Sequence, residues 1–362
     1  MNGEIDHDRL GRVAQVLEHH VAEQTTPGAV GIAVRRKGVV ARWAVGHHTY
    51  EPDSPSVQVD DLYDLASLTK VVVTTTLCLI MESEGRLDID APVAAWLPDF
   101  KGNRREFVTL RHLLAHCSGL PAHIPFFETC GSMDEVLDQV LATELVYEPG
   151  TDTVYSDLGF LLLGMIVAAC GEDAMQNLAQ RMVFDPLGMH EIGYLPKPEL
   201  LSRIPPTEVN AEHRGGLIHG EVHDGNASAM GGIAPHAGLF GKGDDLSRYL
   251  QAMLCDGRLD GEQVLPAEGI RKFTRRAGIV EGSTRALGWD TVSVTGSSAG
   301  RHFSEGSYGH MGFTGTTVWA DPVQDLGVVL LTNRVHPSRE GDGIKRLRPE
   351  FHDAVAEAVL GI

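Results

Sequence analysis

Hydrophobic and polar positions alternate along the first part of the chain in two ways, and each way predicts a different element. In residues 8–23, DRLGRVAQVLEHHVAE, apolar side chains recur every three to four positions. This spacing predicts an amphipathic helix packed on the rest of the protein. Two apolar runs at 27–38 and 39–46 meet at a Lys37-Gly38 turn, which predicts a β-hairpin. The chain is therefore expected to begin with one helix and two paired strands.

The middle of the chain is dominated by helical patterns, and strand patterns return near its end. A helix is predicted from about residue 67 to 83, where Gly85 ends it. Further helical patterns occupy 111–121, 160–171 and 244–254, with loops rich in glycine and proline between them. Strand patterns reappear at 287–295, 316–322 and 326–333, and a helical pattern at 348–361 closes the chain.

Strand material at both ends and helical material in the middle indicate one architecture. The economical arrangement is a single antiparallel sheet that is built from both termini and flanked by helices, with a mostly helical lobe inserted. The sequence therefore predicts an α/β fold of the α+β kind. Residues 1–90 and 265–362 would form the sheet lobe, and residues 91–264 the helical lobe, of one unit spanning 1–362.

Charge and composition exclude several classes of protein. The formal net charge is −19, so we expect no binding to nucleic acid or to an anionic membrane surface. The first ten residues contain acidic side chains and no apolar segment typical of a signal peptide. The apolar run VVVTTTLCLI at 71–80 is too short to span a bilayer. Five scattered cysteines, without a CxxC pair, favour reduced thiols and a cytoplasmic protein.

The stretch LASLTK places a serine and a lysine three positions apart at the start of this apolar run. On a helix, Ser67 and Lys70 would share one face, and Asp64 could cap the first turn. Burial disfavours a charged lysine and lowers its pKa, so a neutral Lys70 could take the proton of Ser67. Alone, the pair proves little, because such short matches are common by chance and more often mark a helix-start serine and a solvated lysine.

Two further motifs follow in order along the chain. Tyr155-Ser156-Asp157 precedes an apolar helical run, and His310-Met311-Gly312 precedes a strand. Together with LASLTK, these motifs resemble serine hydrolases of the class C β-lactamase and penicillin-binding-protein type, which include many esterases. That family's pattern is Ser-x-x-Lys, then Tyr-x-Asn, then Lys-Thr-Gly or His-x-Gly. The resemblance runs nearly end to end, and it implies a β-lactamase/transpeptidase-like fold.

The resemblance implies a role for each matching residue. Ser67 would be the nucleophile, Lys70 would help to deprotonate it and stabilise charge, and Tyr155 would relay protons as base and then as acid. The family's oxyanion hole uses two backbone N–H groups, which here would belong to Ser67 and to Phe313, the residue after Gly312. Without the other two motifs, Tyr155 would be an ordinary core tyrosine.

Three departures from the family pattern bear on the substrate. Asp157 replaces the usual asparagine and could pair with Lys70 instead of holding a substrate amide. Met311 stands in place of the threonine, so no hydroxyl is available there to bind a substrate carboxylate. His310 replaces the lysine and would give a weaker, pH-dependent positive charge at this catalytic position. All three changes favour a neutral acyl ester over a β-lactam or a peptide carboxylate.

Residues 219–240 gather several histidines and a carboxylate, which also invites a metal-site interpretation. The spacing of His219, His223, Asp224 and His236 matches no zinc signature such as HExxH. Similar stretches line the surroundings of the active site in some relatives of the resembled family. We therefore expect His223 and His236 to bind substrate or order loops, and we expect no metal.

The segment GSSAG at 296–300 matches the G-x-S-x-G motif of α/β-hydrolases, with Ser298 at its centre. That motif requires a strand, a sharp turn and then a helix. The residues after Gly300 do not have a helical pattern, so we interpret GSSAG as a flexible loop.

These observations predict a serine hydrolase that works through an acyl-enzyme and needs no cofactor. The best-supported activity is a carboxylesterase acting on small or medium acyl esters, with a small-molecule ester or amide as its substrate. Two alternatives stay open. One is a β-lactamase, D-Ala-D-Ala carboxypeptidase or D-aminopeptidase that uses the same residues. The other is a penicillin-binding sensor without turnover. The sequence does not determine the oligomeric state.

Overall fold

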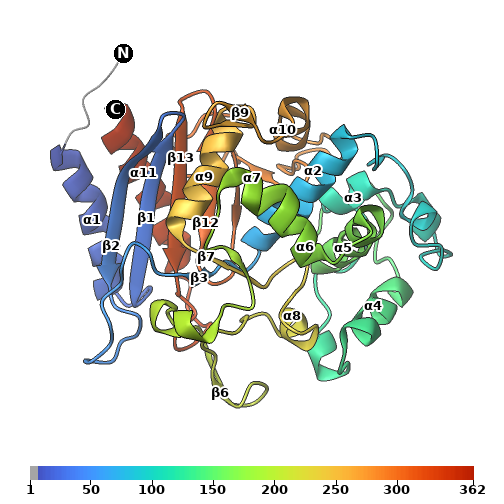
Figure 1. Cartoon of the computed structure of the whole chain (residues 1–362), viewed down its shortest axis with the longest axis horizontal. Helices are drawn as coiled ribbons and strands as arrows, with labels where there is room; N and C mark the ends of the chain where they lie inside the picture. Colours follow the sequence, from blue (N-terminus) through green and yellow to red (C-terminus); the bar gives the residue numbers. More distant parts are fainter. Residues whose placement is uncertain (1–6) are drawn as a thin grey trace.

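The computed structural model describes residues 7–362, and its centre is a six-stranded antiparallel sheet (Figure 1). Its strands lie in the order β10 (Asp290–Thr291), β11 (Tyr308–Met311), β12 (Thr317–Asp321), β13 (Leu326–Thr332), β1 (Gly28–Arg35) and β2 (Gly38–Gly46). The N-terminal hairpin joins the C-terminal strands where Ile32 pairs with Val329. The predicted sheet built from both ends of the chain is therefore confirmed.

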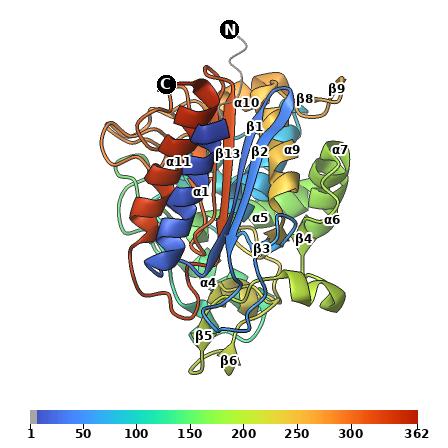
Figure 2. The same ribbon diagram turned by 90° about the vertical axis from the view of Figure 1, so that its left-hand side faces the viewer.

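Both faces of the sheet are covered by helices. Helices α1 (His7–Ala22) and α11 (Ile344–Leu360) lie side by side on one face (Figure 2). Helix α9 (Gly243–Leu254) packs against β1 and β13 on the other face. Strand β1 is buried from Gly28 to Val34, and its alternate side chains enter the two hydrophobic clusters on opposite faces. This explains why its sequence is apolar at nearly every position.

The helices beside the sheet surround one central helix. It begins with a π-helical segment, η1 (Lys70–Thr75), and continues as α2 (Thr76–Ser83). Every residue of 70–81 is buried, which explains why a run of valines and threonines, poor helix formers in water, is helical here. Of the remaining helices, α5 (Asp157–Gly171) and α10 (Ala267–Thr274) pack on this central helix. The others are α3 (Leu110–Leu114), α4 (Met133–Ala142), α6 (Met175–Ala179), α7 (Asp185–Leu187) and α8 (Gly225–Ala229).

Shorter elements complete the described chain. Strands β3 (Tyr63–Asp64), β7 (Leu239–Gly241) and β4 (Gly193–Tyr194) form a small sheet, β5 (Val209–Asn210) pairs with β6 (Gly216–Leu217), and β8 (Arg258–Leu259) pairs with β9 (Glu262–Gln263). The 3₁₀ helices are η2 (Val93–Ala95), η3 (Arg105–Phe107), η4 (Phe126–Glu128) and η6 (Pro198–Arg203), and η5 (Gln180–Phe184) is a short π-helix. The β5–β6 hairpin projects beyond the main sheet (Figure 1).

Several predicted boundaries differ from those observed. The strand pattern at 287–295 yields only the two-residue strand β10, and the last helix begins at Ile344 and contains Pro349. Helix α9 falls in the range predicted for the helical lobe, yet it packs on the sheet. This contact does not define where one lobe ends and the other begins, so the lobe boundaries stay a prediction. The prediction of no signal peptide rests largely on residues outside the described part of the chain.

Within residues 7–362, no helix is by itself long and apolar enough to cross a membrane. Two consecutive helical segments, Asp157–Gly171 and Met175–Leu187, are separated by a sharp bend. Together they are long and apolar enough to cross a membrane, by length and composition only.

Candidate active site

The predicted nucleophile lies at the mouth of the buried central helix. Asp64 accepts a hydrogen bond from the Ala66 N–H at 2.8 Å, and Ala66 has a φ of +46°, uncommon for a residue with a side chain. This capped turn presents Ser67 just before the helix. The Lys70 ammonium, wholly buried, donates to Ser67 Oγ at 2.9 Å. The predicted contact between the serine and the lysine is therefore present.

Lys70 is held in its charged form by a buried ion pair. Its Nζ lies 2.8 Å from Asp157 Oδ1 and also donates to the backbone oxygen of His236 at 3.2 Å. Burial by itself would lower the pKa of Lys70, but Asp157 and the hydroxyl of Tyr155 outweigh it, and the pKa is raised. The hypothesis of a neutral, proton-accepting lysine is therefore wrong. The structure contains the ion pair between Asp157 and Lys70 that the sequence offered in place of a contact between Asp157 and substrate.

Tyr155 faces this ion pair from the end of the loop before α5. Lys70 Nζ lies 4.9 Å from the centre of its ring, and the Arg285 guanidinium lies 5.2 Å from it. The ring packs on His116, whose Nδ1 accepts the Ser156 N–H at 3.0 Å. The Tyr155 hydroxyl is buried and has no hydrogen-bond partner among the described residues. The phenol is thus fixed in position while its oxygen remains available.

His310 does not supply the positive charge that its position implied. It lies on β11 with its ring centre 5.9 Å from that of Tyr155. Burial lowers its pKa well below the usual value, and the charges of Lys70 and Arg285 add to this. Neither ring nitrogen has a partner among the described residues. His310 is therefore a neutral imidazole near pH 7, and the prediction of a pH-dependent cation there is wrong.

Two backbone N–H groups are available where the resemblance places the oxyanion hole. Within residues 7–362, neither the Ser67 nor the Phe313 N–H donates a hydrogen bond to the protein. The two segments are tied together, because Thr314 Oγ1 donates to the Asp64 oxygen at 2.7 Å and Thr316 Oγ1 to the Leu65 oxygen at 3.1 Å. These bonds fix the spacing of the two N–H groups before any substrate binds.

Gly312 allows this close approach of the two segments. A β-carbon at position 312 would lie 2.6 Å from the Leu65 oxygen and 2.1 Å from Thr316 Oγ1. No side chain fits there without moving the turn that carries the Phe313 N–H. The structure therefore gives Gly312 the role of a spacer beside the predicted oxyanion hole.

The hydroxyl, phenol and imidazole groups described above border one cavity of about 520 Å³, whereas Lys70 is buried beneath Ser67. Ser67, Tyr155, His310 and Phe313 line it, so the serine and the phenol from distant parts of the sequence face a common space. The β5–β6 hairpin contributes Asn210, His213 and Arg214 to its wall. This convergence of Ser67 and Tyr155 on one cavity is what the resemblance to serine hydrolases implied.

The Arg348 and Arg334 guanidinium groups hold the turn that contains Phe313. Arg348 donates to the Gly312 oxygen at 2.6 Å, and Arg334 donates to the Phe313 oxygen at 2.9 Å. The Gly312 carbonyl and the Phe313 N–H belong to the same peptide group. Because hydrogen-bonded groups polarise one another, the charge of Arg348 strengthens this N–H as a donor.

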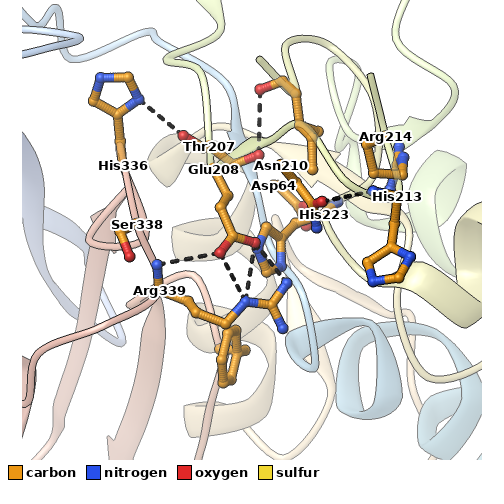
Figure 3. Close-up of polar contacts among 12 residues, drawn as sticks. Asp64, Thr207, Glu208, Asn210, His213, Arg214, His223, His336, Ser338 and Arg339 are labelled. Carbon is orange, nitrogen blue, oxygen red and sulfur yellow. Dashed lines mark hydrogen bonds and ion pairs between the residues drawn. The ribbon is translucent and has the colours of Figure 1, made fainter. Parts of the chain in front are cut away.

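The histidines predicted to surround the site order the loops. His223 bonds Glu208 at 3.0 Å, stacks on Phe313 and lines the cavity, and Glu208 also binds Arg339 through two oxygens (Figure 3). His236 lies behind the cavity and bonds Asp224 at 3.0 Å. His219 bonds backbone oxygens of the 198–204 segment and does not line the cavity.

One group of side chains in this region has metal-ligating atoms close together. One ligand atom each of Asp157, Asp224 and His236 lies within 4.8 Å of the others. Lys70, however, already places its ammonium against Asp157 at 2.8 Å. A second cation beside it would be repelled. The arrangement therefore fits an ion-pair network better than a metal centre.

Several of these residues had no sequence signal. Five residues reach the site from separate loops and from α11: His116, Arg285, Arg334, Arg339 and Arg348. Only His116 and Arg348 lie in predicted helical patterns, and neither pattern indicated a functional role. The competing motif at 296–300 is followed by turns and bends, with no helix before β11, so it does not form a nucleophile elbow. Ser298 is absent from the cavity wall.

The Asp157–Lys70 pair predicts a specific dependence of stability on pH. Burial by itself would raise the pKa of Asp157, but the charge of Lys70 outweighs burial, and the pKa is lowered in the folded state. Its stabilising effect is therefore complete above the unfolded value of about 4 and is lost as the pH falls further. We expect Asp157→Asn to melt below wild type at pH 7, and this difference to shrink at pH 3. Thermal melts from pH 7 to pH 3 measure it.

The exposed Asp138→Asn variant on α4 serves as a control, because no partner of Asp138 is found among the described residues. It should melt like wild type throughout the pH series. A difference between Asp157→Asn and wild type that does not depend on pH would contradict the assigned ion pair.

The antiparallel sheet, the flanking helices and the serine–lysine–tyrosine cavity define a serine hydrolase with the fold of penicillin-binding proteins. The profile of the Beta-lactamase family matches residues 13–351. The chain belongs to the Beta-lactamase family.

Relatives in sequence cover most of the chain. It is 32% identical to the N-acetylmuramyl-L-alanine amidase of Bacillus subtilis, over 91% of this chain and 81% of that protein. It is 33% identical to a putative D-alanyl-D-alanine carboxypeptidase of Escherichia coli, over 76% of this chain and 69% of that protein.

Solved structures share the fold at lower identity. EstCE1, a hydrolase with promiscuous acyltransferase activity, has a TM-score of 0.77 at 21% identity, covering 96% of this chain and 98% of that chain. A penicillin-binding protein homologue from Caulobacter crescentus has a TM-score of 0.77 at 20% identity, covering 98% of this chain and 99% of that chain. The predicted fold class is confirmed.

Proposed function

We propose that the chain hydrolyses small or medium acyl esters through an acyl-enzyme formed on Ser67. The observation that carries the proposal is one cavity lined by Ser67, Tyr155 and Phe313, with the buried, charged Lys70 bonded to the Ser67 hydroxyl and with two N–H groups that have no partner among the described residues. Nucleophile, proton carrier and oxyanion donors are the parts that acyl transfer needs.

The protonation of Lys70 assigns the proton transfers to Tyr155. Tyr155 acts in its deprotonated form, which the neighbouring Lys70 charge stabilises. The phenolate oxygen takes the Ser67 proton while Oγ bonds to the acyl carbon, and the negative charge passes to the carbonyl oxygen. The Ser67 and Phe313 N–H groups bind the oxyanion. The intermediate collapses by breaking the bond to the leaving alcohol, which receives the proton from Tyr155. Water then attacks the acyl-enzyme and gives a proton to Tyr155. Tyr155 returns this proton to Ser67 Oγ as the bond to the acyl group breaks and the acid leaves.

Amide hydrolysis is the second candidate function. Sequence relatives at 32% and 33% identity are named as an amidase and a putative carboxypeptidase. The same acyl-enzyme chemistry serves esters and amides. Esters come first because Asp157, bound to Lys70, offers no neutral side-chain amide to a substrate. The third alternative, a penicillin-binding sensor without turnover, gains no support from a site in which all three reacting groups are in place.

A substrate panel tests the proposal directly. Purified protein is given a short-chain 4-nitrophenyl ester, a chromogenic cephalosporin, a D-alanyl dipeptide and a muramoyl peptide. We expect steady turnover of the ester. Turnover of the peptide substrates or the cephalosporin without ester turnover would overturn the proposal, and stoichiometric acylation without turnover would favour the sensor. The cytoplasmic location and the oligomeric state stay outside this test, and the former is still a prediction.

Arg348 is expected to act on the rate through the peptide group that it holds. Burial and the charge of Arg334 lower its pKa to about 9, so it is still charged at pH 7. Arg348→Met should lower kcat about 10- to 100-fold and change KM much less, because the charge on the oxyanion develops only in the transition state. Steady-state kinetics on the ester measure both constants.

The control for this variant lies on the same helix. Arg346 is exposed and pairs with Glu23 away from the cavity, so Arg346→Gln should behave as wild type. Arg348→Lys should recover part of kcat, since it restores the charge but not the planar donor geometry. An increase in KM with unchanged kcat in Arg348→Met would contradict the assigned role.

A further inference from the structure

Arg334 and Arg339 lie beside Phe313 on the cavity wall, and Arg214 lines the same cavity. We call these three residues the arginine wall. All three line the cavity. The Arg334 guanidinium lies 4.5 Å and that of Arg339 5.8 Å from the centre of the Phe313 ring, and Arg334 also donates to the Arg339 oxygen at 2.8 Å. Arg214 reaches the cavity from the β5–β6 hairpin. The wall thus combines parts of the chain more than 100 residues apart.

The charges of the arginine wall are only partly neutralised by the protein. Arg339 binds both oxygens of Glu208 (Figure 3). Arg214 pairs at 3.1 Å with Glu221, a highly exposed side chain, and such a pair contributes little. Arg334 has no carboxylate partner within residues 7–362 and donates only to backbone oxygens. One guanidinium therefore faces the cavity with its charge unmatched.

The carboxylates that border the cavity do not correct this imbalance. Asp157 is paired with Lys70, Asp224 with His236, and Asp290 lies 3.8 Å from Arg285. Each acidic group on the wall is thus already engaged. This positive region occurs on a chain whose formal net charge is −19. A cleft of one sign in a protein of the opposite sign selects for ligands of complementary charge.

Holding these guanidinium groups together costs stability. Burial and the nearby Arg339 lower the pKa of Arg334, which reports that its charged form is disfavoured in the free protein. Two backbone oxygens could be satisfied by a neutral donor such as glutamine, so the loop contacts of Arg334 do not require a charge. An oxyanion placed between the guanidinium groups would remove the repulsion and gain charge-assisted hydrogen bonds.

We propose that the arginine wall binds an oxyanion, a carboxylate or phosphate group, carried by the acyl substrate. The inference rests on the proposed function and specifies its substrate class: small acyl compounds with a negative charge away from the scissile bond. It replaces the neutral substrate expected from His310, Met311 and Asp157. Those positions report on one edge of the cavity, whereas the arginines approach from the hairpin and from the 333–343 loop.

Paired esters that differ only in charge test the proposal. The anionic substrate is mono-4-nitrophenyl glutarate and the neutral one is its methyl ester. Wild type should have a kcat/KM at least about tenfold higher for the anionic ester, and this preference should weaken as salt rises from about 0.05 to about 0.5 M. In Arg334→Gln the preference should fall about tenfold or more. Arg334→Lys should retain part of it.

Two further variants keep the kinetic test decisive. Arg214→Gln tests the wall from the hairpin if Arg334→Gln does not fold, and its preference should fall about threefold. Arg12→Gln, an exposed position on α1 outside the cavity, should keep the wild-type preference. Equal kcat/KM for the two esters in wild type, or an unchanged preference in both cavity variants, would overturn the proposal.

A binding measurement separates this proposal from the proposed function. Calorimetry on Ser67→Ala with glutarate, inorganic phosphate and dimethyl glutarate needs no turnover. Binding of glutarate alone assigns a carboxylate, binding of phosphate alone assigns a phosphate group, and loss of either in Ser67→Ala/Arg334→Gln supports the wall. If Ser67→Ala binds anions selectively while the wild type shows no ester turnover, the esterase proposal is refuted and the arginine wall is still supported. Binding of dimethyl glutarate alone, or of none of the three, would sink the wall.

Discussion

Ser67→Ala should lower ester turnover by about 10³-fold or more while leaving the fold intact. Loss of a nucleophile removes the covalent route and leaves only the contribution of the oxyanion donors and of binding. The side chain lost is small, and the buried contacts of Lys70 with Asp157 and His236 remain. The same variant should gain no mass on exposure to a fluorophosphonate, whereas wild type should gain one adduct on residue 67.

The matched control is the second candidate serine. Ser298, at the centre of the GSSAG motif, does not line the cavity, so Ser298→Ala should keep both turnover and labelling. Turnover in Ser67→Ala close to that of wild type, or an adduct on another side chain, would refute the acyl-enzyme on Ser67 and with it the esterase proposal.

Lys70→Met should affect activity and stability together. The ammonium donates to Ser67 Oγ and stabilises the deprotonated Tyr155 that accepts the proton, so its loss should lower kcat/KM by about 10³-fold. It also leaves the largely buried Asp157 carboxylate without its partner at 2.8 Å. Removal of one member of a buried pair costs about 3 kcal/mol of the free energy of unfolding. Kinetics and denaturant unfolding measure the two effects separately.

A double variant separates the catalytic effect from the structural one. Lys70→Met/Asp157→Asn contains no unpaired charge at this point, so its stability should return towards wild type while its activity stays low. Recovery of activity together with stability would show that Lys70 acts only by holding the site together. A Lys70→Met variant as stable as wild type would contradict the buried ion pair.

The succession of helices and strands and the three motifs could be predicted from the sequence, because they depend on local patterns. A period of three to four positions in 8–23 and continuous apolar runs at 28–34 and 326–331 fix helix and strand within a few residues. Ser67 and Lys70 are close because three positions on one helical turn bring side chains together. Neither feature requires knowledge of distant contacts.

Protonation states at the same residues could not be predicted in this way. Burial of Lys70 was foreseen, and burial alone would have made it neutral; the carboxylate of Asp157, 87 positions further along the chain, reverses the outcome. His310 was expected to carry charge, and its burial beside Lys70 and Arg285 keeps it neutral. The sign of each shift depends on burial and on charges from other segments.

The sequence by itself determined the elements, the antiparallel sheet built from both ends, and a serine, a lysine and a tyrosine as the chemical groups. Each follows from spacing along the chain or from motifs in a recognisable order. Only the tertiary structure decided that Lys70 is held in its charged form against Asp157, and that Arg214, Arg334 and Arg339 line one cavity. Electrostatic interactions act through space over distances of a few ångströms, and those distances are set by packing between segments remote in sequence.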